Sequence, residues 1–260
     1  MPIPRKLLLP LSSAALLVAC ATSPLGRSQL KLYPDSDLNE MGVTAFAQTS
    51  KEVPVTSNGQ TTAYVNCIAN AITREVGGVW EVKVFESKDV NAFALPGGKI
   101  GVYTGLLGVA KGQDQLAAVI GHEVAHVIAG HSNERVSQQQ VAGLGMNVAQ
   151  LILGGGAGGG ALMSALGAGA QYGVLLPFSR AHESEADLLG LDYMAKAGFD
   201  PRAASQLWRN MAQAGGQKPP EFASSHPSDE TRIRQIEARV PQDLPLYQQA
   251  QASGKKPKCG

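Results

Sequence analysis

The sequence predicts an α+β protein that is mostly helical, with a small three-stranded sheet ahead of its central helix. Apolar residues recur at helical spacing along most of the chain, and three short runs between positions 79 and 103 have strand character. Aromatic residues make up only 5% of the chain, which favours close-packed helices over an aromatic-rich β-sandwich. The 260 residues suffice for one domain with a sizeable core, and a formal charge of +1 without a basic stripe argues against nucleic acid as a partner.

Residues 1–19 have the pattern of a signal peptide, because Arg5 and Lys6 precede an apolar run that is short for a membrane span. The run ends in Leu-Val-Ala before Cys20, which resembles a bacterial lipobox with cleavage before the cysteine and lipid attached to it. An ordinary secretory signal with an incidental cysteine is the alternative. Ala21, where retained lipoproteins have Asp, favours the periplasmic face of the bacterial outer membrane.

The two ends of the mature chain are expected to lie outside the folded domain, and the C-terminal one to be loosely ordered. Residues 20–32 would form a lipidated polar tether, and residues 241–260 a polar C-terminal tail. Cys67 and Cys259 remain besides the lipid-bearing cysteine, and an oxidising compartment permits a disulfide between them. Two free thiols are the alternative, since sequence gives no distance between the two residues.

Residues 33–240 are predicted to form the folded domain. Its expected elements, in chain order, are helices over 34–48 and 61–76, strands over 79–85, 91–95 and 99–103, a short helix from 104, a long helix from 113, and helices over 179–196, from 201 and over 229–240. The buried side of the first strand is expected to carry Trp80, Val82 and Val84.

An insert over residues 141–178 carries no charged residue and is almost all glycine in its middle. Such dense glycine argues against a regular membrane-spanning helix. Its apolar flanks are expected to cover the active site, lie on the membrane surface or form an oligomer contact.

The long central helix carries the motif His122-Glu123-Val-Ala-His126. Two histidines four apart on a helix lie about 40° apart around its axis, so both imidazoles point the same way, as two ligands of one Zn²⁺ ion must. Glu123 lies where a carboxylate can reach a metal-bound water. The surrounding Val, Ala and Ile residues argue against a solvated surface face.

A third metal ligand has to come from elsewhere in the chain. His131 follows the second histidine by five residues, which turns it away from the ligand face. The helix over 179–196 offers a better pair, because Glu183 can bind zinc and Asp187, one turn on, can orient a zinc-bound histidine. His182 is the alternative ligand, and Glu185 is expected to face solvent.

Three segments together resemble one family of metallopeptidases. They are Asn91-Ala-Phe-Ala-Leu-Pro-Gly-Gly-Lys, Gly121-His-Glu-Val-Ala-His126 and Glu183-Ser-Glu-Ala-Asp187. In order and spacing they resemble the family of HtpX and the CAAX prenyl proteases, and most of all its small periplasmic lipoprotein members. The resemblance covers roughly residues 26–240. It implies a zincin-type domain of the gluzincin class, with one Zn²⁺ per chain on His122, His126 and Glu183.

The same resemblance implies the remaining roles. Glu123 would be the catalytic base and Asp187 the partner of a ligand histidine. His226, a lone histidine before proline, is expected either to stabilise the oxyanion of the transition state or to fill the open zinc position and hold the enzyme latent. Arg180 and Arg232 are weaker candidates for polar roles in the cleft.

The function predicted from these residues is a zinc endopeptidase of the bacterial cell envelope. Asn91, Ala92, Phe93 and Ala94 are expected to form the strand edge on which an extended substrate pairs. The expected partners are unfolded or misassembled polypeptides, the membrane, and either an outer-membrane assembly machinery or a second copy of the chain. A noncatalytic or latent zinc-stabilised chaperone is the alternative function.

Overall fold

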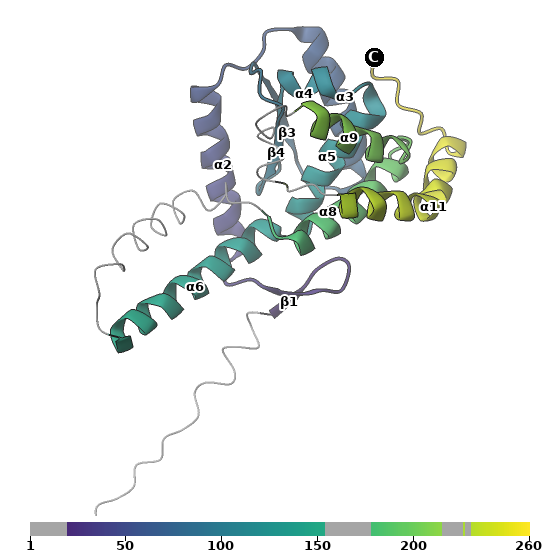
Figure 1. Ribbon diagram of the computed structural model, residues 1–260. Helices are drawn as coiled ribbons and strands as arrows, with labels where there is room; N and C mark the ends of the chain where they lie inside the picture. The colour runs from purple at the N-terminus through teal and green to yellow at the C-terminus, as the bar shows by residue number, and fades with distance from the viewer. Residues whose placement is uncertain (1–19, 154–177, 215–225, 227–229) are drawn as a thin grey trace, which may run out of the picture.

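The computed structural model of the chain describes residues 20–153, 178–214, 226 and 230–260 (Figure 1). The fold is α+β and mostly helical, which confirms the predicted class. Its elements are β1 (Cys20–Thr22), β2 (Ser28–Leu30), α2 (Asp35–Glu52), α3 (Gly59–Val76), β3 (Glu81–Phe85), β4 (Ala92–Leu95), β5 (Lys99–Tyr103), α4 (Thr104–Val109), α5 (Gln113–Ile128), α6 (His131–Leu153), α8 (Arg180–Lys196), α9 (Ala203–Ala214) and α11 (Glu230–Ala252).

The three-stranded sheet has the order β3-β5-β4, so β4 is an edge strand. Strand β5 pairs in parallel with β3 and antiparallel with β4. One face packs on the main core, and the other is covered by α2, whose Phe46 contacts Phe85 and Phe93. The strand predicted from Val79 therefore differs in two ways. It begins at Glu81, and Phe85 on its second face is as buried as Val84 on its first.

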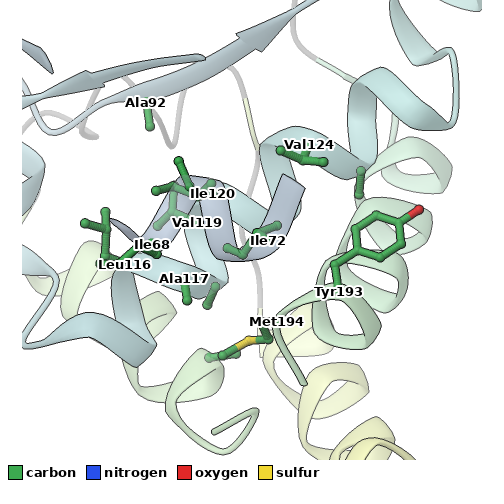
Figure 2. Close-up of a cluster of buried hydrophobic side chains, with 14 of the residues drawn as sticks. Ile68, Ile72, Ala92, Leu116, Ala117, Val119, Ile120, Val124, Tyr193 and Met194 are labelled. Carbon is green, nitrogen blue, oxygen red and sulfur yellow. The ribbon is translucent and has the colours of Figure 1, made fainter. Parts of the chain in front are cut away.

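Helix α5 is the centre of the protein (Figure 2). Every residue from Gln115 to His126 is buried, because α3, β4, α8 and α9 surround the helix. Gly121 is required where α5 crosses α8, since a Cβ atom there would lie 2.8 Å from the carbonyl oxygen of Gly190. This close approach of two backbones brings the motif of α5 against the acidic face of α8.

The expectations for both ends of the mature chain are wrong within the described residues, because each end packs on the body of the protein. Residues 20–32 contain an antiparallel hairpin of β1 and β2 that packs on α6, where the Leu32 N–H donates to Ser137 Oγ at 2.8 Å. At the other end, α11 continues through Pro241 to Ala252 because it buries one side against α8 and α9. A solvated tail would leave that apolar side exposed to water.

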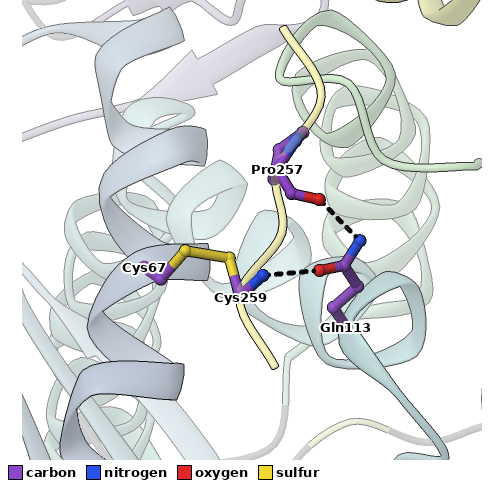
Figure 3. Close-up of a disulfide and its surroundings, with 4 residues drawn as sticks. All are labelled: Cys67, Gln113, Pro257 and Cys259. Atoms are coloured by element: carbon purple, nitrogen blue, oxygen red, sulfur yellow. Dashed lines mark hydrogen bonds between the residues drawn. A yellow bond between two sulfur atoms is a disulfide. The ribbon is translucent and has the colours of Figure 1, made fainter.

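A disulfide joins Cys259 to Cys67 of α3, with an S–S distance of 2.09 Å (Figure 3). Next to it, the Cys259 N–H donates to Gln113 Oε1 at 3.0 Å, and Gln113 Nε2 donates to the Pro257 carbonyl at 2.9 Å. The bridge closes a sequence separation of 192 residues. A loop of that length restricts the unfolded chain strongly, and native disulfides typically contribute about 2–5 kcal/mol.

The predicted insert over 141–178 is only partly visible in the fold. Helix α6 includes its first residues and extends away from the body in Figure 1. Residues 154–177, with the glycine-rich centre, lie outside the described residues, as does the predicted signal peptide over 1–19. Among the helices that the structure does describe, none is both long and apolar enough to cross a membrane.

Candidate active site

The motif of α5 presents three buried side chains at one point of the helix. The Nε2 atoms of His122 and His126 lie 3.0 Å apart, and the carboxylate of Glu123 lies beside them with 2% of its residue surface exposed. Gly130, with φ at 68°, ends the helix two residues after Ile128 and turns the chain into α6. That turn brings His131 back toward the motif.

Glu183 reaches the two histidines from α8. Its Oε2 atom lies 3.5 Å from His122 Nε2, and its Oε1 atom lies 3.4 Å from His126 Nε2. Burial alone would raise the pKa of Glu183, but the neighbouring His226, His122 and His126 side chains lower it well below its usual range. The carboxylate is therefore ionised and aimed at the two imidazoles.

His226 completes the group. Its Nδ1 atom lies 3.0 Å from Glu183 Oε1 and 3.2 Å from His122 Nε2. The donor atoms of His122, His126, Glu183 and His226 all lie within 4.8 Å of one another. Ligand atoms around a tetrahedral Zn²⁺ are about 3.3 Å apart, given bonds of about 2.0–2.1 Å, so these four donors have the spacing of a zinc site.

The proton positions support a cation at the centre. His122 Nδ1 lies 2.9 Å from the carboxylate of Asp187, which can only accept, so this nitrogen carries a proton. In neutral His122 the Nε2 atom then carries no proton. Its lone pair faces the lone pair of His126 Nε2 at 3.0 Å. Burial opposes a charged imidazole, yet Asp187 and Glu183 together raise the pKa of His122 to about 9. The site thus attracts a proton or a metal ion between its donors.

Asp187 is itself held by Arg232 of α11. The guanidinium donates from Nε to Asp187 Oδ2 and from Nη2 to Oδ1, both at 2.8 Å, and its Nη1 lies 2.6 Å from Glu183 Oε2. Its plane lies over the ring of Trp208 at 4.2 Å. Of the two arginines predicted for polar roles, Arg232 thus reaches the site, whereas Arg180 is exposed at the first turn of α8.

Glu123 occupies the position that a general base requires. Its Oε1 atom lies 3.5 Å from His226 Nε2, and its Oε2 atom accepts from the Ala94 N–H at 3.3 Å. Burial raises the pKa of this carboxyl group above its usual value. A carboxylate with raised proton affinity beside metal donors is suited to take a proton from water.

The predicted substrate edge borders this carboxylate. The carbonyl of Asn91 accepts from the Tyr103 N–H at 3.0 Å, so it faces inward to β5. Strand alternation then turns the backbone groups of Ala92 and Ala94 to the outer edge of β4, on the side of Glu123. Phe93 has its side chain on the opposite face of the sheet, packed among aromatic rings.

Three polar residues lie behind the site. His182 points away from the metal donors and pairs with Glu134 at 3.1 Å. His131 lies outside the group of four donors, and its Nδ1 atom is 2.9 Å from His126 Nδ1. The expectation that Glu185 faces solvent is wrong, because the residue is 5% exposed and its carboxylate lies 3.2 Å from His131 Nε2. Helical spacing places Glu185 on the side of α8 opposite Glu183. It cannot show which other segment of the chain covers that side.

A buried helix with two histidine donors, a carboxylate from a second helix and a base at the edge of a small sheet together define a zinc metallopeptidase. The chain belongs to peptidase family M48, whose family model matches residues 56–240. Zinc is the cofactor of that family, and the four donors described above can hold one ion.

Similar proteins come from mitochondria and from bacteria. The mitochondrial metalloendopeptidase OMA1 of Schizosaccharomyces pombe is 43% identical over 190 residues, covering 70% of this chain and 54% of its own. Metalloprotease LoiP of Escherichia coli is 31% identical over 84% of this chain and 83% of its own. The beta-barrel assembly-enhancing protease of Yersinia pestis is 28% identical over 79% of this chain and 44% of its own. The chain spans about half the length of the OMA1 relatives that it matches.

Proposed function

We propose that this protein is a zinc-dependent endopeptidase of the bacterial cell envelope that cleaves unfolded or misassembled periplasmic and outer-membrane proteins. The observation that carries the proposal is the place of Glu123. Its carboxylate lies between the metal donors and β4, the edge strand of the described sheet, so one group contacts both the proposed reacting centre and the strand proposed to bind substrate.

In the proposed mechanism, His122, His126 and Glu183 hold Zn²⁺, which would supply an acidic bound water and polarise the scissile carbonyl. An extended peptide pairs with the outward-facing backbone groups of Ala92 and with the Ala94 carbonyl, which brings the scissile bond to the side of β4 where Glu123 lies. Glu123 takes the water proton and then passes it to the leaving amine. Asp187 keeps its histidine partner in the tautomer that leaves Nε2 free.

A test of the activity uses the purified chain, with zinc, on casein and on folded and unfolded forms of a single protein. We expect cleavage of casein, faster cleavage of the unfolded form, loss of activity with 1,10-phenanthroline, and recovery when zinc is added back. The reason is that pairing along a strand edge requires extended backbone and little side-chain identity. Equal rates on the folded and unfolded forms would count against the proposed substrate class.

His226 supports a latent resting state in this proposal. With Nδ1 at 3.2 Å from His122 Nε2, it belongs to the group of donors and would compete with an attacking water for a bound Zn²⁺ ion. We expect His226→Ala to raise the rate of casein cleavage by up to about tenfold. Without His226 as a fourth protein ligand, water no longer competes for its place at the zinc ion, and the active state is populated more. Initial rates at saturating zinc measure this. A fall in rate would instead assign His226 to the transition state.

The position of His226 among the metal donors is also the observation that favours the alternative function, a zinc-stabilised chaperone for outer-membrane proteins. The two functions differ in a direct assay. Binding of unfolded chains without cleavage, by both the wild type and His226→Ala, would favour the chaperone. The printed name of the Yersinia pestis relative refers to β-barrel assembly, which motivates an assembly machinery as the partner to test.

The proposed location rests on the lipobox pattern before Cys20 and on the similarity to bacterial LoiP. Several relatives carry mitochondrial names, so the bacterial envelope, the outer membrane and the finer resemblance to HtpX and the CAAX prenyl proteases stay proposals. Fractionation of expressing bacteria tests the anchor. Wild type is expected with outer membranes and Cys20→Ser in the soluble periplasmic fraction, and equal distribution of both would contradict the lipid anchor.

A further inference from the structure

The two ligand histidines are held from behind in different ways. For His122, the second ring nitrogen meets the carboxylate of Asp187 directly at 2.9 Å. For His126, the second ring nitrogen meets another imidazole, with 2.9 Å between its Nδ1 and His131 Nδ1. The far nitrogen of His131 then lies 3.2 Å from Glu185 Oε2. Each of the two histidines therefore has a carboxylate behind it. Asp187 contacts His122 directly, whereas His131 lies between His126 and Glu185.

One arrangement of protons satisfies this second chain of contacts. When Nε2 of neutral His126 faces the metal, its proton is on Nδ1 and is donated to His131 Nδ1. His131 is then neutral with its own proton on Nε2, which Glu185 accepts. The carboxylate of Glu185 thus fixes the tautomer and the orientation of His126 through one intervening ring.

Glu185 is in turn held by the N-terminal hairpin. Arg27, in the turn between β1 and β2, donates from Nε to Glu185 Oε2 at 3.0 Å, and the Leu25 N–H donates to Oε1 at 3.4 Å. The other end of the same guanidinium donates to both oxygens of Glu134, at 2.7 and 2.6 Å. Arg27 therefore bridges α8, which carries Glu185, and α6, which carries Glu134 and His131.

The burial of these groups makes the bridge energetically relevant. Glu134 and Glu185 have only 4% and 5% of their side-chain surface exposed, while Arg27 has 29%. Two buried carboxylates on neighbouring helices repel each other and lose hydration unless a cation pairs with them. The planar fork of Arg, which reaches two carboxylates at once, meets this need better than the single ammonium of Lys.

The arrangement parallels the one behind His122. There, Arg232 holds Asp187 with two donors at 2.8 Å, and Asp187 orients the ligand. Here, Arg27 holds Glu185, which orients His126 through His131. The two arginines differ in origin, because Arg232 belongs to α11 whereas Arg27 belongs to a hairpin that begins at Cys20.

We propose that Arg27 is a positioning residue for the metal centre, acting through Glu185 and His131 on the zinc ligand His126. The hairpin that follows Cys20 is thereby part of the metal site's support as well as the connection to the proposed anchor. The inference rests on the zinc site proposed above. Partners that hydrogen-bond a ligand histidine directly typically change metal affinity by about 10–100-fold, and Arg27 acts on His126 through two intervening side chains.

The test measures zinc affinity of the purified chain by competition with a chromophoric chelator, together with the visible absorption of the Co²⁺-substituted protein. Arg27→Met is expected to weaken zinc binding about tenfold or more and to alter the Co²⁺ spectrum. Arg27→Lys, which keeps the charge and packing, is expected to fall between Met and wild type because one ammonium cannot serve both carboxylates.

Arg239→Met is the matched control. Arg239 is 24% exposed and also bridges two carboxylates, Asp192 at 2.7 Å and Asp243 at 3.2 Å, but neither of them contacts the metal donors. We expect this variant to lose thermal stability while zinc affinity stays within about a factor of two. An equal loss of zinc affinity in Arg239→Met and Arg27→Met would overturn the inference, because it would make the effect one of general stability.

A double-mutant cycle tests the route through His131. In a His131→Phe background, which keeps a ring but removes both nitrogens, Arg27→Met is expected to change zinc affinity by less than about a factor of two. If the double variant instead lost zinc affinity by the product of the two single-variant factors, Arg27 would not act through His131. If Arg27→Met fails to fold, the same cycle is run with Arg27→Lys. Failure of wild type to bind zinc would overturn the metal site itself, whereas normal binding by both Arg27 variants would overturn only this inference.

Discussion

Glu123→Gln is expected to reduce peptide hydrolysis by roughly a thousandfold while zinc content and fold stay unchanged. The amide has the shape of the carboxylate, and its oxygen can still accept from the Ala94 N–H, which lies 3.3 Å from Glu123 Oε2. It cannot take a proton from water, so the step that generates the nucleophile is lost. Casein cleavage at equal zinc loading, with circular dichroism and metal analysis, measures the effect.

A matched control for this variant is Glu81→Gln. Glu81 lies on β3, at the opposite edge of the described sheet from β4, and pairs at the surface with Lys99 at 2.7 Å. It makes the same chemical change and should leave the rate of casein cleavage at the wild-type level. Survival of more than about a tenth of the activity in Glu123→Gln would show that the proton is taken by another group.

Local geometry brings the candidate metal donors of α5 and α8 together, which is why this group could be predicted from the sequence. His122 and His126 share a face of α5, and Glu183 and Asp187 share a face of α8, because residues four apart lie one turn apart. Helical spacing fixes these pairs wherever the two helices pack. The contact between the pairs also depends on Gly121, whose missing side chain permits the crossing with α8.

The environment of Glu185 could not be predicted in the same way. Its position on α8 shows that it points away from Glu183, and an amphipathic helix usually turns that side to water. Here the side is covered by the N-terminal hairpin, with Leu25 standing 160 residues away in sequence. Helical periodicity contains no information on which distant segment packs on which face. Arg27 was missed for the same reason.

The C-terminal residues show a second limit of local signals. Pro241 removes a backbone donor and usually ends a helix, so residues from 241 onward were expected to be a tail. In the structure α11 continues through Pro241 to Ala252, with Ala250 buried against the body and the buried Asp243 paired with Arg239 at 3.2 Å. The presence of two cysteines in the mature chain besides Cys20 permitted a disulfide to be predicted. Only the fold shows that Cys259 lies against Cys67 of α3.

Glu183→Ala is expected to weaken zinc binding by more than about a hundredfold and to abolish hydrolysis. Loss of a partner behind a ligand costs about 10–100-fold in affinity, and loss of an ionised ligand must cost more, because the cation then faces neutral imidazoles alone. The fold should survive, since Arg232 keeps its two contacts with Asp187 at 2.8 Å and still joins α11 to α8.

Asp187→Asn provides the graded comparison for this prediction. The amide cannot serve as an ionised acceptor for His122 Nδ1, yet all donors of the metal remain. Zinc affinity measured by chelator competition should therefore fall in the order wild type, Asp187→Asn, Glu183→Ala. Unchanged zinc content in Glu183→Ala would remove Glu183 from the ligand set and leave His226, whose Nδ1 lies 3.0 Å from Glu183 Oε1, as the third protein donor.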